Sequence, residues 1–236
     1  MCIRDRDIPY ALWMVFVLWG TATMAHSSLT YLELGELHPF ALEKYPLPQP
    51  ELWFAALVVH VPTALFALPA CWLLQTRWML RRFPRAHRYL GRLTALVLLV
   101  AVVPSGAYLA LFAKGGWPST VGFLLSGAIV VVAMVRSVQA ARSRRFREHR
   151  RYSGHVFAQL VVAIVSRVIL VGADRFALDP VTTYVVALWG PVLGCALVAE
   201  WWYGSRSFSW ARLRPGSVLG GRYEKARTDI GVGSLR

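Results

Sequence analysis

Histidine and arginine side chains inside or beside long apolar segments are the residues of this chain best suited to chemistry. His60 lies deep in one apolar run, and Arg167 lies at a similar depth in a later one. An ionisable side chain is costly to place in hydrocarbon, so both are candidate functional groups. No carboxylate lies in the interior of an apolar run, which makes an anionic ligand a reasonable partner for Arg167. The alternative is structural: Arg167 extends outward toward Asp174, and His60 binds a backbone carbonyl freed by Pro62 or the hydroxyl of a neighbouring residue.

Three more histidines, His87, His149 and His155, lie where apolar runs follow basic segments. Imidazole is the usual protein ligand of haem iron. One hypothesis makes His60 an axial ligand of haem b on the outer side, with the other three as ligands on the inner side. Arg167 would then pair with a haem propionate or a quinone oxygen. The alternative places the three histidines among arginines that bind lipid phosphates, without a cofactor.

A polar stripe is expected in the run that follows His155. On a helix His155, Gln159 and Ser166 share one face, and this stripe leads toward the level of Arg167. His26 and His38 are weaker candidates, because they lie at the outer end of a run and in a loop. The sequence contains no GxGxxG, P-loop, HExxH or GxSxG motif.

Six long intervals without Asp, Glu, Lys or Arg mark the elements that must position these side chains; the fifth interval ends at Arg167 and the sixth at Glu200. The chain is 56% hydrophobic and 16% charged, whereas about 25% charged residues are typical of soluble domains. Runs of this length cross the hydrocarbon of a bilayer as helices. The predicted fold class is therefore an all-α, polytopic integral membrane bundle. Its six predicted transmembrane helices are Pro9–Ala25, Leu52–Leu74, Leu93–Ala113, Thr120–Val135, Val156–Gly172 and Val181–Tyr203.

A weak internal repeat predicts how these helices are arranged. The segments 82–92 and 145–155 share an Arg-Phe start, and they agree again at Arg88/Arg151, Tyr89/Tyr152 and Gly91/Gly154. Each segment joins two apolar runs, as in two copies of one helical hairpin. Spans two to five should form a four-helix core, with spans one and six packed outside it.

The distribution of charge predicts the orientation in the membrane. The net charge is +14, and 13 of the 26 basic residues lie in the segments 77–92 and 136–151. Positive loops stay in the cytoplasm, so both segments and both termini are expected there, in a bacterial inner membrane. This distribution gives no support to nucleic-acid binding. The arginines expected to bind anionic headgroups are Arg82, Arg85, Arg88, Arg92, Arg145, Arg147, Arg150 and Arg151.

The chain is predicted to have four parts. Residues 1–50 form a first span and an extended external loop, and residues 51–172 form the core. Residues 173–203 form the sixth span, and residues 204–236 form a basic, disordered cytoplasmic tail. A cleaved signal peptide is the alternative for the first span. The cysteines Cys2, Cys71 and Cys195 have no CxxC spacing, so neither a disulfide nor a cysteine metal site is expected.

The residues of these turns resemble a known family. His60, the run His87-Arg88 before Gly91-Arg92, and His149-Arg150-Arg151 before Arg167 resemble the predicted bacterial membrane proteins called domain of unknown function 2306. The likeness covers about residues 52–170, and Tyr152-Ser153 stands where members usually have Trp-Met, as in a divergent member. The helical core is loosely similar to cytochrome b561-like and ferric-reductase-like proteins, whose ligand histidines lie in pairs deep within four helices. Here His60 alone lies deep in a span.

Two functions from different classes are compatible with these residues. One is a redox protein linked to haem b or quinone. The other is a cofactor-free scaffold that binds anionic lipids and a protein partner. Transport of a small solute is a third alternative.

Overall fold

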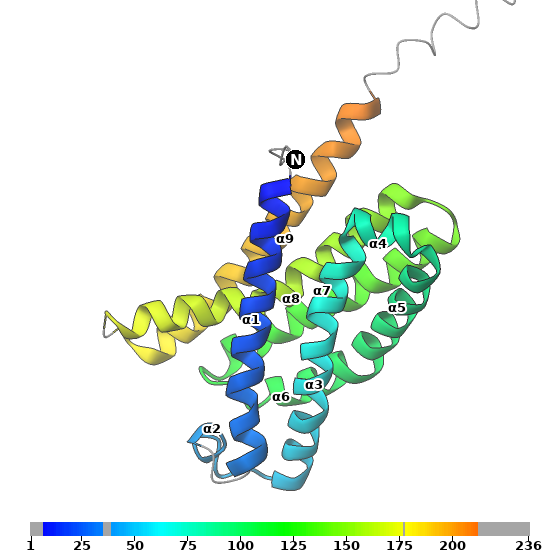
Figure 1. Ribbon diagram of the computed structural model, residues 1–236. Coiled ribbons are helices and arrows are strands. Elements are labelled where there is room, and N and C mark those ends of the chain that lie inside the picture. The colour runs from blue at the N-terminus through cyan, green and yellow to red at the C-terminus, as the bar shows by residue number, and fades with distance from the viewer. Residues whose placement is uncertain (1–6, 35–38, 177, 212–236) are drawn as a thin grey trace, which may run out of the picture.

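The computed structural model describes residues 7–34, 39–176 and 178–211, together with the side chains of 12–28, 41–176 and 178–203. These residues form long helices joined by short turns (Figure 1). In chain order the elements are α1 (Asp7–Leu34), α2 (Pro39–Leu42), α3 (Pro50–Gln75), α4 (Arg77–Arg82), α5 (Pro84–Val97), the π-helix η2 (Leu98–Val102), α6 (Val103–Ala110), α7 (Trp117–Arg142), α8 (Phe146–Asp174) and α9 (Pro180–Ala211).

Five helices are long and apolar enough to cross a membrane. They are Pro50–Gln75, Pro84–Ala110, Trp117–Arg142, Phe146–Asp174 and Pro180–Tyr203. They match predicted spans two to six, and the continuous helix Pro84–Ala110 comprises α5, η2 and α6. The helix α1 takes the place of the first predicted span. The predicted all-α membrane bundle is confirmed.

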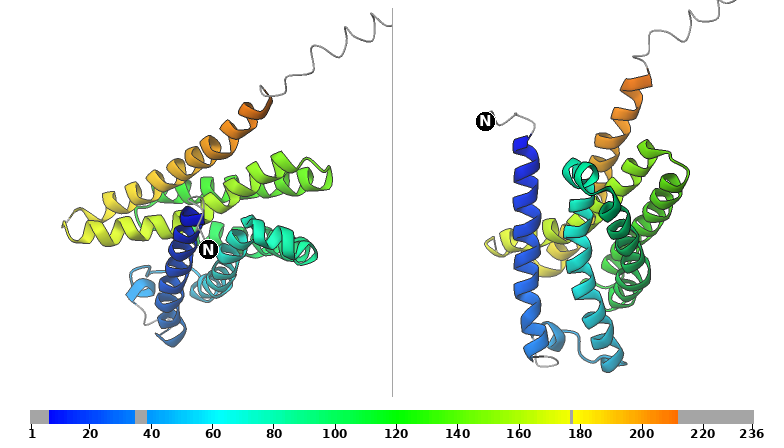
Figure 2. Two further views of the ribbon diagram at one scale, coloured as in Figure 1. Left: turned by 45° about the horizontal axis from the view of Figure 1, so that its top comes forward. Right: turned by 45° about the vertical axis from the view of Figure 1, so that its right-hand side comes forward.

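The core is a closed ring of four helices. The helix α3 contacts α5–α6, α6 contacts α7, α7 contacts α8, and α8 returns to α3. The helix α1 packs on α3 and α8 from outside, and α9 packs on α8 and α7 (Figures 1 and 2). All four core helices contribute to one buried cluster, formed by Ala67, Cys71, Ala95, Leu98, Val102, Val130, Ala133, Met134 and Val156. The predicted arrangement, with two hairpins in the core and two helices outside, is therefore confirmed.

Prolines and short polar side chains fix where several helices begin. Proline lies at the first or second position of α3, α5 and α7, where its missing N–H costs nothing. Phe83 precedes Pro84 and leaves the α region at φ −133° and ψ 60°, which separates α4 from α5. Asp179 caps α9, since its Oδ2 accepts the backbone N–H of Thr182 at 2.7 Å.

A π-helical turn interrupts the third span. The segment Leu98–Val102 is π-helical, and Pro104 follows it directly after Val103. Pro104 has no N–H to donate to the carbonyl four residues earlier, and its ring crowds that carbonyl. A wider turn relieves this conflict, and such bulges occur often at functional sites. The bulge brings Val102 and Ser105 against α3, as described below.

Several helices extend beyond the predicted spans. The helix α1 runs on to Leu34, so the first part of the predicted extended loop is helical, and that part of the prediction was wrong. The two basic segments, predicted as turns, are mostly helical, since α5 begins at Pro84 and α8 at Phe146. The helix α9 continues to Ala211, inside the predicted disordered tail; residues 212–236 lie outside the described residues.

The basic segments 77–92 and 136–151 lie at one end of the bundle, which we call the basic end (Figures 1 and 2). The opposite end carries the α6–α7 turn, where Gly115 and Gly116 adopt φ of 86° and 64°. These left-handed angles favour glycine. Lys114 forms an ion pair with Glu43 at 2.8 Å, which ties the segment after α2 to this turn.

Candidate functional site

His60 is held against the π-helical turn of the third span. Its Nδ1 lies 3.0 Å from the carbonyl oxygen of Val102 and 3.1 Å from Oγ of Ser105. A carbonyl oxygen can only accept, so in the neutral ring Nδ1 carries the hydrogen and Nε2 carries the lone pair. Gly106 makes this contact possible, because a Cβ there would lie 2.7 Å from Cε1 of His60.

His149 repeats this arrangement in the second hairpin. Its Nδ1 lies 3.0 Å from the carbonyl oxygen of Ser137 and 2.9 Å from the hydroxyl oxygen of the same residue. Ser137 is buried on α7, opposite the first turns of α8. By the same argument Nδ1 of His149 is the donor, and Nε2 keeps its lone pair. In each hairpin, one helix therefore accepts a hydrogen bond from a histidine of the other helix and fixes that histidine in the tautomer with its hydrogen on Nδ1.

His87 lies near His149 at the basic end. It belongs to the start of α5, and the imidazole of His149 contributes to its electrostatic environment. Its Nδ1 is buried and has no hydrogen-bond partner among the described residues. A buried polar atom without a partner is costly and indicates a missing ligand or a bound water. The predicted proximity of His87 and His149 is consistent with this geometry.

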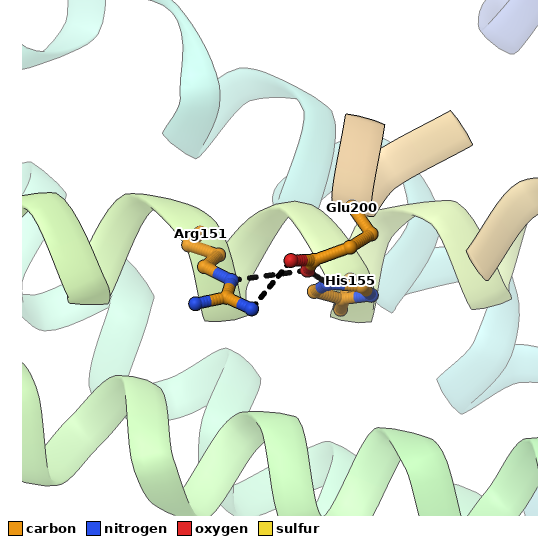
Figure 3. Close-up of polar contacts among 3 residues, drawn as sticks. All are labelled: Arg151, His155 and Glu200. Carbon is orange, nitrogen blue, oxygen red and sulfur yellow. Dashed lines mark hydrogen bonds and ion pairs between the residues drawn. The ribbon is translucent and has the colours of Figure 1, made fainter. Parts of the chain in front are cut away.

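His155 is separated from these two histidines and faces α9. Its Nε2 lies 3.0 Å from Oε2 of Glu200. Arg151 binds both oxygens of the same carboxylate, with Nε 3.0 Å from Oε2 (Figure 3). An ionised carboxylate accepts from both side chains, so Nε2 of His155 is a donor in this arrangement. That atom is therefore already engaged by Glu200 on α9.

The predicted polar stripe on α8 is directed at neighbouring helices. Gln159 is buried; its Nε2 donates to the carbonyl of Val192 on α9 at 3.1 Å, and its Oε1 accepts from Ser126 on α7 at 2.8 Å. Ser166 Oγ is buried without a hydrogen-bond partner among the described residues. Arg167 itself is exposed, and its guanidinium lies 3.5 Å from the carbonyl of Ala163, a weak contact.

The arginines predicted to bind headgroups are mostly free at the surface. Seven of the eight are exposed: Arg82, Arg85, Arg88, Arg92, Arg145, Arg147 and Arg150. Arg151 is half-buried against Glu200, and Arg145 pairs with Glu148 at 2.7 Å. The guanidinium of Arg92 lies 5.9 Å from the ring centre of Tyr89.

The remaining candidates stay apart from this site. His26 is exposed on α1, whereas His38 and Cys2 lie outside the described residues. Cys71 and Cys195 are free thiols. Among the residues that the structure describes, no three His, Cys, Asp or Glu side chains converge as a metal site would require.

Sequence reasoning missed three residues that hold these histidines. Glu200 was treated as the boundary of a charge-free run, although it lies within the span Pro180–Tyr203. Ser105 and Ser137 were missed as imidazole partners. The signal for Ser105 was its place directly after Pro104, where backbone carbonyls lose their helical donors. Nothing in the sequence near Ser137 distinguishes it from other small residues at helix contacts.

Comparison with known proteins agrees with the helical membrane fold. The family DUF2306, described as a predicted membrane protein, matches residues 57–203. That match covers more than half of the chain and includes all of the histidines discussed above except His26 and His38. No curated protein and no solved structure matches the chain. The chain therefore belongs to the DUF2306 family of predicted membrane proteins.

Proposed function

We propose that this multi-pass membrane protein is a redox protein that carries b-type haem. One observation carries the proposal: His60 and His149, one in each hairpin, donate Nδ1–H to the neighbouring helix and keep Nε2 as a free lone pair. Histidines that ligate metals almost always have this arrangement, because the outer hydrogen bond fixes the tautomer and raises the basicity of the ligand nitrogen.

The residues at the basic end fit a haem in a second respect. His87 has a buried Nδ1 without a partner among the described residues, and it lies near His149. Coordination would remove the cost of leaving such a ring unpaired. In this proposal His87 and His149 would hold a haem at the basic end. His60 packs against Val102, which lies 15 residues after His87 and hence about 22 Å along a helix, so His60 would be a ligand of a separate haem nearer the opposite end. Bound haem would supply a one-electron couple.

Two predicted ligands have different roles in this proposal. Nε2 of His155 is engaged by Glu200, so we assign His155 to the α8–α9 contact and not to haem binding. Arg167 is exposed and has no carboxylate partner among the described residues, so it stays available to a propionate or a quinone oxygen. Both assignments follow from the hydrogen bonds each side chain already makes.

The orientation belongs to the same proposal. The basic end carries 13 basic residues in two segments, and such segments remain in the cytoplasm. We place the basic end and both termini in the cytoplasm of a bacterium, with the protein in the inner membrane. Cysteine-reactive labelling of single cysteines introduced at Arg85 and Lys114 in intact cells tests this, since the two should react from opposite sides.

The dithionite-reduced minus oxidised absorption spectrum of the purified protein tests the haem. We expect a Soret shift and a sharp α-band from protein produced with sufficient haem. His60→Ala and His149→Ala should each reduce the haem content, and His155→Ala serves as the matched control because it should keep the spectrum. Circular dichroism of every variant separates loss of haem from loss of fold.

A flat spectrum from folded, monodisperse protein would overturn the proposal. The cofactor-free scaffold, the competing function, predicts that result. A spectrum that depends on His155 and not on His149 would show that the ligands were assigned wrongly. Transport of a small solute would instead appear as uptake into vesicles that is unaffected by removal of haem.

A further inference from the structure

We propose that the basic end is a binding surface for the phosphate groups of anionic phospholipids. The inference is independent of the haem, because it uses different residues. On the first hairpin the exposed arginines include Arg82, Arg85, Arg88 and Arg92, and no Asp or Glu occurs between residues 77 and 92. None of these four forms an ion pair with a described residue.

The second hairpin extends the same surface. Arg147 and Arg150 are exposed on the first turns of α8, and both hairpin turns lie at the same end of the bundle (Figure 2). The one acid between residues 136 and 151, Glu148, is taken up by Arg145 at 2.7 Å. The surface thus carries many positive charges that no carboxylate among the described residues neutralises.

Exposed aromatic side chains lie among these arginines and indicate a membrane as the partner. Trp78 is 59% exposed and packs edge-on against Phe83, with ring centres 5.2 Å apart. Tyr89 and Phe146 are 70% and 64% exposed. The amphipathic rings of Trp78 and Tyr89, mixed with long cationic side chains, suit the headgroup region, where one end of the ring is apolar and the other wet. A soluble acidic partner would leave these rings unused.

The choice of basic residue points to phosphate. Both segments contain arginine and no lysine, although lysine would serve orientation in the membrane equally well. The planar guanidinium forms two parallel hydrogen bonds to a phosphate, which an ammonium group cannot do. We therefore commit to phospholipid phosphates as the ligand of this surface.

Lipid retention in native mass spectrometry tests the proposal. Purified protein is titrated in mixed micelles with phosphatidylglycerol or with phosphatidylcholine. We expect preferential retention of phosphatidylglycerol and a rise in melting temperature that phosphatidylcholine does not give. A variant with Arg82→Gln, Arg85→Gln and Arg88→Gln should bind phosphatidylglycerol about 100-fold more weakly, the combined effect of three surface arginines.

Matched controls separate the surface from general charge. Arg175→Gln removes an exposed arginine at the far end of α8, away from the basic end, and should leave lipid retention unchanged. Equal retention of both lipids, or equal weakening by this control, would overturn the proposal. Displacement of phosphatidylglycerol by millimolar inorganic phosphate would show a site for the free anion. Tight binding of polyglutamate without lipid preference would show a protein-binding surface. The haem spectrum should be the same in all variants, so the two proposals fail separately.

Discussion

The carboxylate of Glu200 is expected to hold α9 against the core, and its removal is the sharpest test of the structure. Glu200→Ala removes the acceptor of two hydrogen bonds from Arg151 and one from His155. The side chains of Arg151 and Glu200 are 43% and 44% exposed, and that of His155 is 17% exposed. The partners that stay behind are a hydrated guanidinium and a largely buried imidazole.

These exposures set the expected size of the effect. Fully exposed ion pairs contribute about 0.2–1 kcal/mol, and breaking buried pairs costs about 3–5 kcal/mol. The network of Glu200 is intermediate between these cases, because Arg151 binds the carboxylate through two hydrogen bonds and His155 is largely buried. We therefore expect Glu200→Ala to lower the free energy of unfolding by about 1–2 kcal/mol. For a chain of this size, that loss corresponds to a fall in melting temperature of about 2–8 °C.

A double-mutant cycle in detergent measures the interaction directly. The variants are Glu200→Ala, Arg151→Ala and the pair together, and the readout is thermal unfolding followed by tryptophan fluorescence. The coupling free energy should be about 1 kcal/mol. Glu148→Ala is the control, since its exposed pair with Arg145 is of the helical i, i+3 kind, worth about 0.2–0.5 kcal/mol. Additive single variants, or equal losses for Glu148→Ala and Glu200→Ala, would refute this reasoning.

Three further predictions concern other contacts of the bundle. Gly154→Val places a Cβ against the ring of Tyr203 and should lower the melting temperature by several degrees, with α9 displaced in cysteine cross-linking to α8. The hydrogen bond and charge of Lys114 hold the pKa of Glu43 below its ordinary value of 4.5, so this ion pair stabilises the fold above pH 4.5 and loses its effect as the pH falls below that value. Both groups are partly exposed to solvent, so the contribution should be under about 1 kcal/mol. Glu43→Gln should remove the pH dependence from a series of melting curves. Gln159→Leu should cost about 1–3 kcal/mol, because it leaves two buried partners without their hydrogen bonds, whereas Gln159→Glu at a pH where the acid is neutral should recover part of the loss.

The architecture could be predicted because charge and length determine which segments enter a membrane. The interval from Glu51 to Arg77, for example, contains no charged residue, and α3 occupies Pro50–Gln75. The ring of four helices followed from the repeat of the two hairpins. Helix ends could not be predicted, since arginine is a good helix former and its long side chain reaches water from within a helix. The helices α5 and α8 therefore begin inside the basic segments.

The candidate site was predictable in its residues and not in their pairing. The depth of His60 marked it as important, and a hydrogen bond to a backbone carbonyl or a neighbouring hydroxyl was its structural alternative. The carbonyl belongs to Val102 in the π-helical turn before Pro104 and not to a residue beside Pro62 of the same helix. His149 and His155 are six residues apart, hence about 240° around the helix, so they face different neighbours. The residue that each histidine contacts depends on how the helices pack, and the spacing of the histidines in the sequence does not determine that packing.

The π-helical turn at Leu98–Val102 sets the rotational phase of everything that follows it in the third span. Each residue of an α-helix turns the chain by about 100°, and a π-helical turn holds about one more residue than an α-helical turn, so the outer half of the span lies in a different phase from the one an unbroken α-helix of the same length would give it. Straightening this turn to an α-helix at the same chain length would swing Ser105 and Gly106 away from His60, whereas deleting one residue within the turn would restore an ordinary helix and keep them in phase. A one-residue insertion or deletion elsewhere in the span would lose the contact. Related chains that have no π-helical turn here should therefore be one residue shorter between Pro84 and Gly106.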